Sequence, residues 1–133
     1  MNILIACDKF RGSLTASAAN DAVLRALNAS NLEVTKSYGR PIADGGEGTL
    51  DALMTDGLRA VRTTARGPFG HWREVTFGYD DRRRFAVVDM ASIAGHPDAA
   101  EHGYDPDRAS SVGVGDVIRA ALDAGAKTVC VAL

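Results

Sequence analysis

Several features that define common classes of protein are missing from this 133-residue sequence. No apolar run approaches the roughly 20 residues that cross a bilayer, and the N-terminus has neither the basic start nor the apolar length of a secretory signal. Only two cysteines occur, Cys7 and Cys130, and each lies in an apolar run. We therefore expect a cytoplasmic protein, away from membranes, whose thiols are buried and reduced rather than joined in a disulfide framework.

An excess of positive charge is also lacking, because the net charge is −2. Nucleic-acid-binding domains usually carry a strong basic excess, so we expect no nucleic-acid partner. The glycine-rich loop of P-loop NTPases, a dinucleotide fingerprint after the first strand and the Gly-x-Ser-x-Gly elbow of hydrolases are all absent. None of the three histidines has the spacing of a zinc site. Any phosphate chemistry must therefore rest on another motif.

What is present is an alternation of apolar runs and helical periodicity, typical of proteins that mix strands and helices. We expect strands at residues 3–7 and 32–38. A helix between them would be capped by Ser13 or Thr15. A second helix is expected at residues 47–55.

The pattern then changes to three strands of an antiparallel meander, followed by a long loop, a helix and a last strand. In that order these segments are residues 58–65, 73–79, 84–90, 92–108, 114–124 and 127–133. The fold class is therefore mixed α/β, with a change of subdomain near Gly67. The chain ends on a buried type of strand, where the next loop of an α/β sheet would follow, so we expect it to be the truncated start of a longer enzyme.

The strongest local signal is the acidic glycine cluster at residues 43–49, ahead of the second expected helix. Consecutive glycines such as Gly45 and Gly46 allow backbone amides to approach an anionic group closely. The carboxylates of Asp44 and Glu47 would repel an anion unless Mg²⁺ lies between them, or unless one accepts a proton from a substrate hydroxyl. From the residues alone, a glycine turn capped by Asp44 explains the cluster equally well.

A second polar cluster, residues 8–15, directly follows the first expected strand. Asp8, Arg11, Gly12 and Ser13 lie there, at the carboxyl end of a strand, where α/β proteins bind ligands. The guanidinium of Arg11 suits a carboxylate or a phosphate. A plain capped connection between strand and helix is the alternative, and without further information it is somewhat favoured.

A third and weaker signal precedes the helix expected at residues 114–124. Ser111 and Gly113 offer a hydroxyl and a glycine amide that suit a phosphate at a helix start. An ordinary capped helix start explains both residues nearly as well.

Taken together, these motifs resemble the bacterial glycerate kinase family. Its members open with a strand followed by Asp-Ser-Phe-Lys-Gly-Ser-Leu, to which residues 8–14 are similar, and later carry Ala-Asp-Gly-Gly-Glu-Gly-Thr, which residues 43–49 match in full. Further matches follow in the family's order at residues 67–70, 89–92, 110–115 and 121–125. The departures are Lys9 for the usual Ser, Arg11 for the usual Lys and Asp89 for the usual Glu.

The resemblance implies a Rossmann-like first lobe, here residues 1–65, and the start of a second, inserted lobe, here residues 66–133. It also implies an ATP-dependent transferase that phosphorylates a hydroxyl of D-glycerate, with ATP and Mg²⁺ as cofactors. Family members continue beyond the last strand of this chain, which corresponds to the N-terminal portion of a typical member. We therefore expect the isolated chain to be inactive.

By the same resemblance, Asp44 would be the catalytic residue, orienting the substrate hydroxyl or binding Mg²⁺ together with Glu47. The expected contacts with substrate or phosphate come from all three clusters: Asp8, Arg11, Gly12, Ser13, Gly45, Gly46, Glu47, Thr49, Ser111 and Gly113. Two alternatives stay open. One is a non-catalytic fragment that binds an anion or a partner, and the other is a kinase for a different small sugar acid.

Overall fold

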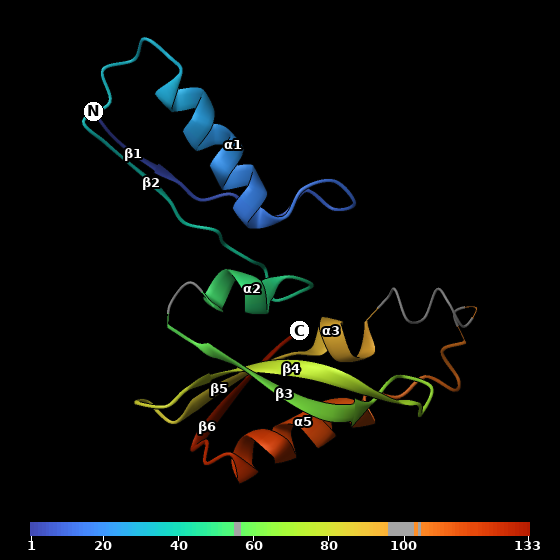
Figure 1. The fold of residues 1–133 in the computed structure, drawn as a ribbon. Helices are drawn as coiled ribbons and strands as arrows, with labels where there is room; N and C mark the ends of the chain where they lie inside the picture. Colours follow the sequence, from blue (N-terminus) through green and yellow to red (C-terminus); the bar gives the residue numbers. More distant parts are fainter. Residues whose placement is uncertain (55–56, 96–102, 104) are drawn as a thin grey trace. The chain divides into compact units, whose positions relative to one another are not determined.

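The computed structural model describes residues 1–54, 57–95, 103 and 105–133. The architecture is mixed α/β with two small sheets (Figure 1). Contacts divide the chain into two compact units, Met1–Asp44 (the N-terminal unit) and Gly45–Leu133 (the C-terminal unit). This division precedes the lobe boundary expected between residues 65 and 66, because the strand at 59–66 pairs within the C-terminal unit. The lobe boundary itself stays a prediction.

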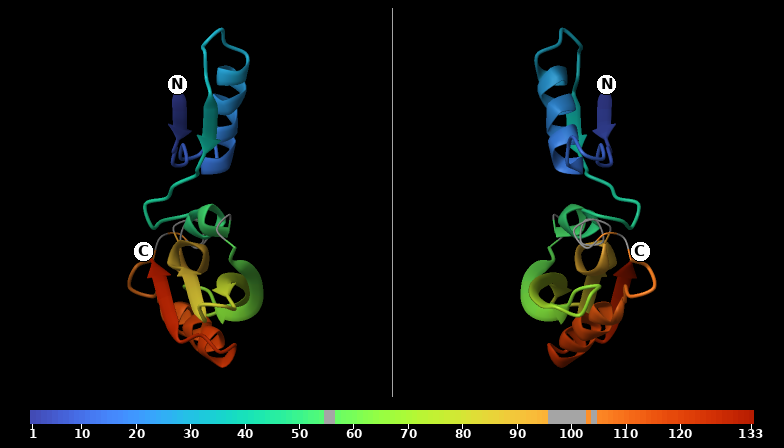
Figure 2. Two further views of the ribbon diagram at one scale, coloured as in Figure 1. Left: turned by 90° about the vertical axis from the view of Figure 1, so that its left-hand side faces the viewer. Right: turned by 90° about the vertical axis from the view of Figure 1, so that its right-hand side faces the viewer.

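The N-terminal unit consists of strand β1 (Asn2–Ile5), helix α1 (Ala16–Asn28) and strand β2 (Lys36–Gly39). The two strands are parallel, and α1 lies on one side of the pair (Figure 2). The second strand was expected from residue 32, but β2 begins at Lys36 because its first partner on β1 is Asn2. Strand length is therefore decided here by the partner strand and not by the local apolar run.

Helix α1 begins directly after Thr15, one of the two residues expected to cap it. The hydroxyl of Thr15 accepts a hydrogen bond from the backbone N–H of Ala18 at 3.1 Å, which satisfies a donor that has no partner within the helix. Ser13 lies outside the helix, in the preceding turn. None of the helices in the described ranges combines the length and the apolarity needed to cross a membrane.

The C-terminal unit is built on a four-stranded sheet whose strands lie in the order β3-β4-β5-β6. Its strands are β3 (Arg59–Arg66), β4 (Trp72–Asp80), β5 (Phe85–Asp89) and β6 (Thr128–Ala132). The first three pair antiparallel, which confirms the expected meander, and β6 adds parallel to β5. The carboxyl ends of β5 and β6 therefore lie at the same edge of the sheet.

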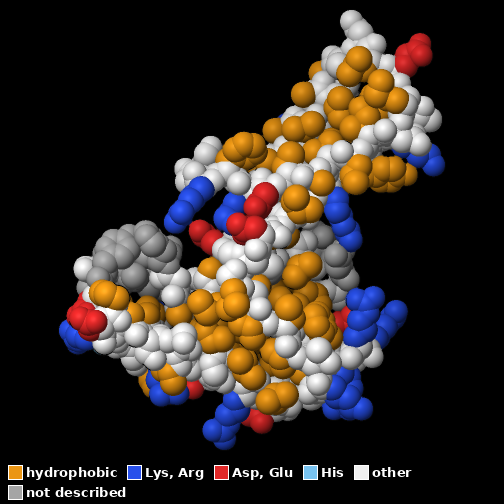
Figure 3. Space-filling model, turned by 180° about the vertical axis from the view of Figure 1, so that it is seen from behind, with side chains coloured by type: hydrophobic (Ala, Val, Ile, Leu, Met, Phe, Trp, Pro, Cys, Tyr) orange, Lys and Arg blue, Asp and Glu red, His pale blue; other side chains and the backbone are white. Residues whose placement is uncertain are grey.

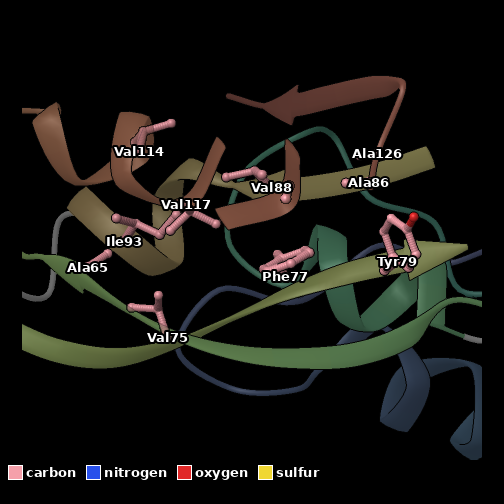
Figure 4. Close-up of a cluster of buried hydrophobic side chains, with 11 residues drawn as sticks. Ala65, Val75, Phe77, Tyr79, Ala86, Val88, Ile93, Val114, Val117 and Ala126 are labelled. Carbon is pink, nitrogen blue, oxygen red and sulfur yellow. The ribbon is translucent and has the colours of Figure 1, made fainter. Parts of the chain in front are cut away.

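The main hydrophobic core lies between this sheet and helix α5 (Val112–Asp123) (Figure 4). Phe77 and Val88 project from the sheet and Val117 projects from the helix, each with no more than 1% of its surface exposed. At roughly 25 cal/mol per Å² of apolar surface removed from water, burial of this cluster is the main stabilising contribution in the unit. The N-terminal unit is different, since Ile5 and Ala19 are the only buried hydrophobic residues described there.

Three local expectations are corrected by the structure. Helix α2 (Thr49–Met54) starts after residue 47 because Gly48 has a φ of 87°, which is incompatible with the helix. A short helix, α3 (Met90–Ala94), occupies the start of the expected loop at 92–108, of which residues 96–102 and 104 lie outside the described residues. Cys130 is exposed rather than buried, since it lies on the edge strand β6, and Cys7 is half-buried.

Helix α5 can approach the sheet closely only because it carries glycine at position 113. A Cβ atom built on Gly113 would lie 1.7 Å from the backbone oxygen of Arg66, whereas one on Gly115 meets nothing within 4 Å. We expect Gly113→Ala to lower the free energy of unfolding by about 3 kcal/mol, because helix and strand must separate. Gly115→Ala should raise it by roughly 0.5–1 kcal/mol, since alanine is the better helix former.

Urea unfolding followed by far-ultraviolet circular dichroism measures both values. Equal stability of the two variants would contradict the close packing of α5 on β3.

Candidate functional site

The glycine loop (residues 45–49) leads into helix α2 and belongs to the C-terminal unit. Gly45 and Gly48 have φ angles of 102° and 87°, a region that side chains with a Cβ rarely adopt. Thr49 closes the turn, because its hydroxyl donates to the backbone oxygen of Gly46 at 2.7 Å and its N–H donates to the same oxygen at 3.1 Å. The glycines thus have a conformational role, and the hydroxyl of Thr49 is already engaged inside the loop.

This loop lies at the edge of the sheet where the parallel strands β5 and β6 end. A Cβ on Gly45 would come within 2.8 Å of the backbone oxygen of Leu133, the residue after β6. The carboxyl ends of neighbouring parallel strands are the usual place for ligands in α/β sheets. The structure therefore puts the sequence's strongest motif at a position suited to binding.

Asp89, the last residue of β5, ties the loop to the sheet although it was not among the predicted site residues. It is 2% exposed, and its Oδ1 accepts hydrogen bonds from the N–H groups of Ala91 at 3.0 Å and Ser92 at 3.3 Å, which caps α3. Its carboxylate also receives a hydrogen bond from the backbone amide of Leu50 in α2. One buried carboxylate therefore joins β5 to the starts of two helices.

Burial raises the pKa of Asp89 above the ordinary aspartate value, because removal from water disfavours the charged form. The three backbone hydrogen bonds act in the opposite direction and favour the carboxylate, and the nearby charge of Asp51 raises the pKa further. Burial is the largest of these effects. Ionisation of Asp89 in the folded state therefore costs free energy, and its hydrogen bonds offset part of that cost.

A cleft of about 480 Å³ opens beside the glycine loop, over the face of β4 that α5 does not cover. Glu47 and Gly48 of the loop line it, together with Glu74 of β4 and Asp89. Among the described residues that line it, carboxylates outnumber cations, and Arg73 is the one basic side chain. The cleft by itself is therefore poorly suited to an unaccompanied anion such as phosphate.

In the N-terminal unit, residues 8–15 form a tight turn between β1 and α1. The N–H groups of Ser13 and Leu14 both donate to the backbone oxygen of Phe10, at 2.8 and 3.0 Å, and Gly12 takes a positive φ of 73° at the bend. Arg11 and Ser13 are exposed on this turn. Their side chains are accordingly accessible to a ligand from solution.

Two of the sequence's polar motifs meet through an ion pair in the N-terminal unit. The Nζ of Lys9 lies 3.3 Å from Oδ1 of Asp44, although the two residues are 35 positions apart. Asp44 keeps 70% of its side chain exposed, whereas Lys9 keeps 22%. The predicted catalytic carboxylate therefore has a cation beside it and remains open to solvent.

Asn20 of α1 anchors the loop that follows β1. The helical periodicity of the sequence does not indicate this role. Its side chain is 2% exposed and donates to the backbone oxygens of Cys7 at 3.1 Å and Ala16 at 2.7 Å. Its Oδ1 accepts from the N–H of Cys7 at 3.4 Å. Asn20 thus holds the peptide just ahead of Asp8, whose own Oδ1 accepts from the N–H of Lys9 at 2.6 Å.

The third predicted cluster lies at the start of α5, packed on the end of β3. Ser111 is exposed and its side chain makes no capping hydrogen bond, while Gly113 contacts the backbone of Arg66. Arg66 forms a two-pronged ion pair with Asp116, with nitrogen–oxygen distances of 2.7 and 2.8 Å. This geometry gives Gly113 a packing role, and phosphate binding by Ser111 and Gly113 stays a prediction.

The Mg²⁺ ligands expected from the sequence are the carboxylates of Asp44 and Glu47. Within the described ranges, no group of three or more His, Cys, Asp or Glu side chains is arranged to hold a metal ion. Mg²⁺ commonly takes only one or two protein carboxylates and completes its shell with water and substrate phosphates. Asp44 and Glu47 each expose a carboxylate, which is a ligand type that Mg²⁺ accepts, and its binding by them stays a prediction.

The family assignment follows from comparison with known proteins. The model of the family described as "Glycerate kinase family" matches residues 3–133, which is nearly the whole chain. This chain belongs to the glycerate kinase family. The resemblance seen in the ordered motifs is thereby confirmed.

Individual relatives agree with this family, at moderate identity. Glycerate kinase of Bacillus subtilis (strain 168) is 35% identical over all of this chain and 35% of its own length. Glycerate 2-kinase of Escherichia coli (strain K12) is 29% identical, again over all of this chain and 35% of its own length. A crystal structure of a Salmonella typhimurium LT2 protein assigned to the glycerate kinases matches with a TM-score of 0.72 and 32% identity, covering 97% of this chain and 35% of that one. The chain thus spans about a third of the length of these glycerate kinases.

The buried carboxylate of Asp89 gives a direct test of how the glycine loop is held. We expect Asp89→Ala to lower the free energy of unfolding by about 2–4 kcal/mol, because it leaves the three backbone donors without their acceptor. Asp89→Asn keeps an oxygen acceptor and should lose less. Urea unfolding measures the losses, and hydrogen exchange at the Leu50 amide should accelerate in the alanine variant.

The pH dependence of these variants has a defined sign. Because the folded-state pKa of Asp89 is raised, its ionisation disfavours folding as the pH rises above the ordinary value of 3.8. The stability of Asp89→Asn relative to the wild type should therefore increase as the pH rises through the raised pKa. A relative stability that falls with pH over that window would contradict the buried environment.

Asp116 should show the opposite dependence. Its ion pair with Arg66 lowers the pKa of Asp116 from 3.8 to about 2, so its stabilising contribution is complete above pH 3.8 and is lost as the pH falls through about 2. Asp116→Asn should be less stable than the wild type at pH 7, and the difference should shrink between pH 4 and pH 2. Asp123→Asn, at an exposed pair with Arg119, is the matched control and should show little change.

Proposed function

We propose that this chain is the N-terminal part of a glycerate kinase, an enzyme that transfers the γ-phosphoryl group of ATP to a hydroxyl of D-glycerate. The observation that carries the proposal is the glycine loop, held by buried Asp89 at the carboxyl ends of β5 and β6 in a chain of this family. The loop's position supports a ligand site there, and membership of the family supports phosphoryl transfer as its chemistry.

Phosphoryl transfer depends mainly on positioning and on neutralising charge, so the protein needs few reactive groups. In the N-terminal unit, the exposed guanidinium of Arg11 would form paired hydrogen bonds with the carboxylate of glycerate or with a phosphate. Asp8, Gly12 and Ser13 belong to the same turn, and the hydroxyl of Ser13 would donate to the same anion. The turn is held by its backbone hydrogen bonds, which limits the entropy lost on binding.

Asp44 would orient the substrate hydroxyl and accept its proton. The adjacent Lys9, at 3.3 Å, supplies a positive charge that would attract an anionic substrate to this carboxylate. In the C-terminal unit, the backbone amides of Gly45 and Gly46 would donate to an anionic group. Mg²⁺, where bound by Asp44 and Glu47, would neutralise phosphate charge.

The second candidate function is that of a non-catalytic fragment, which binds ligand without turning it over. It is favoured by one observation, the coverage of only about a third of each relative. A related kinase for another small sugar acid would use the same groups, so ligand choice separates these cases.

Isothermal titration tests the proposal with the chain as it stands. Glycerate and ATP·Mg²⁺ are titrated separately into the wild type, Arg11→Gln and Asp44→Asn. Loss of a charged hydrogen-bonding partner should weaken binding of at least one ligand about tenfold or more in Arg11→Gln. Arg25→Gln, an exposed cation on α1, is the matched control and should bind as the wild type does.

Lactate and glycolate, titrated in parallel, report on substrate class. Binding that is indifferent to Arg11 and Asp44 would contradict the assigned roles. Tighter binding of another hydroxy acid than of glycerate would favour the related kinase.

A further inference from the structure

We propose that the cleft beside the glycine loop binds the nucleoside part of the phosphoryl donor and leaves the phosphates outside, next to the loop. The inference deepens the proposed function, and it rests on that function for the identity of the donor as ATP. The described residues that line the cleft all belong to the C-terminal unit.

The cleft is walled largely by regular secondary structure. Helix α2 forms one side, on the face of the sheet opposite to α5 (Figure 1). Leu50 of α2 lies directly on β4, since a Cβ atom built on Gly78 would come within 2.7 Å of its Cδ1. Ala60 of β3 pairs with Gly78, and Thr76 lies two residues earlier on the same face of β4. Strand and helix thus hold the floor and one wall of the cleft in place.

The size and the apolar part of the cleft suit a small organic ligand. Its volume of about 480 Å³ falls within the range of roughly 300–1,000 Å³ that is usual for such sites. Leu50, Met54 and Ala60 give it an apolar wall and floor, and Thr76 and Ser92 add hydroxyl groups. The polarisable thioether of a methionine makes favourable contacts with aromatic rings. A planar base therefore fits this lining.

The charge of the cleft restricts the ligand further. Glu47, Asp51 and Glu74 contribute carboxylates, and acidic side chains are seen at the surface beside the glycine loop in Figure 3. Arg73 is the one cation among the described lining residues, and its Nη2 already donates to two backbone oxygens of α3, at 2.9 and 2.6 Å. Ionised carboxylates accept hydrogen bonds and repel anions. The lining thus favours a neutral group that carries hydrogen-bond donors.

Of the two substrates in the proposed function, only ATP contains such a group. Glycerate is an anion, whereas adenosine is neutral and offers an amine and ribose hydroxyls to carboxylate acceptors. Carboxylates accept from ribose hydroxyls in other nucleotide-binding α/β folds. Glu47 and Gly48 belong both to the glycine loop and to the lining of the cleft. A nucleoside in the cleft would therefore have its phosphates beside the loop amides proposed to receive them.

The test is a titration of adenosine into the chain, followed by ¹⁵N–¹H shift mapping and by calorimetry. We expect saturable shifts of the Leu50 and Thr76 amides and no shift around Asp123, at the far end of α5. Because adenosine carries no phosphate, its affinity should not depend on Mg²⁺, whereas that of ATP should.

A variant that fills the cleft gives the second measurement. Ala60→Phe should weaken adenosine binding about tenfold or more, because the new ring occupies the floor of the cleft. Ala60 is exposed, so the fold should tolerate the change, which circular dichroism checks. Thr64→Phe is the matched control and should bind as the wild type does. Thr64 is exposed on the same strand and the same face, outside the described lining.

The outcomes separate this inference from the proposed function. Binding of ATP·Mg²⁺ without binding of adenosine, adenosine shifts that avoid Leu50 and Thr76, or unchanged affinity in Ala60→Phe would each overturn the nucleoside site while leaving the kinase assignment in place. Adenosine binding in the cleft of a chain that binds neither ATP·Mg²⁺ nor glycerate would support the site and contradict the proposed function. If Ala60→Phe fails to fold, the shift map of the wild type decides.

Discussion

The buried carboxylate of Asp89 is the interaction on which the geometry of the candidate site depends. It ends β5, caps α3 and accepts a hydrogen bond from the Leu50 amide in α2. The glycine loop leads directly into α2, so the hydrogen bond from Leu50 to Asp89 helps to hold the end of the loop at the sheet edge. A buried carboxylate is costly unless hydrogen-bonded, and three backbone donors offset that cost.

The two units differ in how much apolar surface they bury. The C-terminal unit has a continuous core between α5 and the sheet, made possible by the close approach of Gly113 to β3. The N-terminal unit instead depends on polar contacts, in which Asn20 holds the loop after β1 and Lys9 pairs with Asp44. Polar contacts orient chain segments but contribute little net stability. The residues proposed to contact substrate thus lie partly on a unit in which few of the described hydrophobic residues are buried.

Much of the fold was predictable because its signals are local. The antiparallel meander and a helix cap at Ser13 or Thr15 follow from short-range patterns and were expected from the sequence, and the structure places the cap at Thr15. The late start of β2 was not, because its length depends on pairing with β1, nor was the five-residue helix α3, which is too short to show a period. The order of the motifs identified the family, whereas the burial of Asp89 could not be read from an acidic residue at a strand end. The exposure of Cys130 was likewise hidden, since it depends on which sheet edge stays open.

The most direct measurement is a ¹⁵N–¹H shift map of the chain on addition of ATP·Mg²⁺ and, separately, of glycerate. If the glycine loop and the turn after β1 each contact ligand as proposed, the amide signals of Gly45 and Gly46 and the guanidinium signal of Arg11 should move in a saturable way. The signals at the C-terminal end of α5, around Asp123, should stay unchanged. Shifts confined to α5, or no saturable shift at millimolar ligand, would contradict this role.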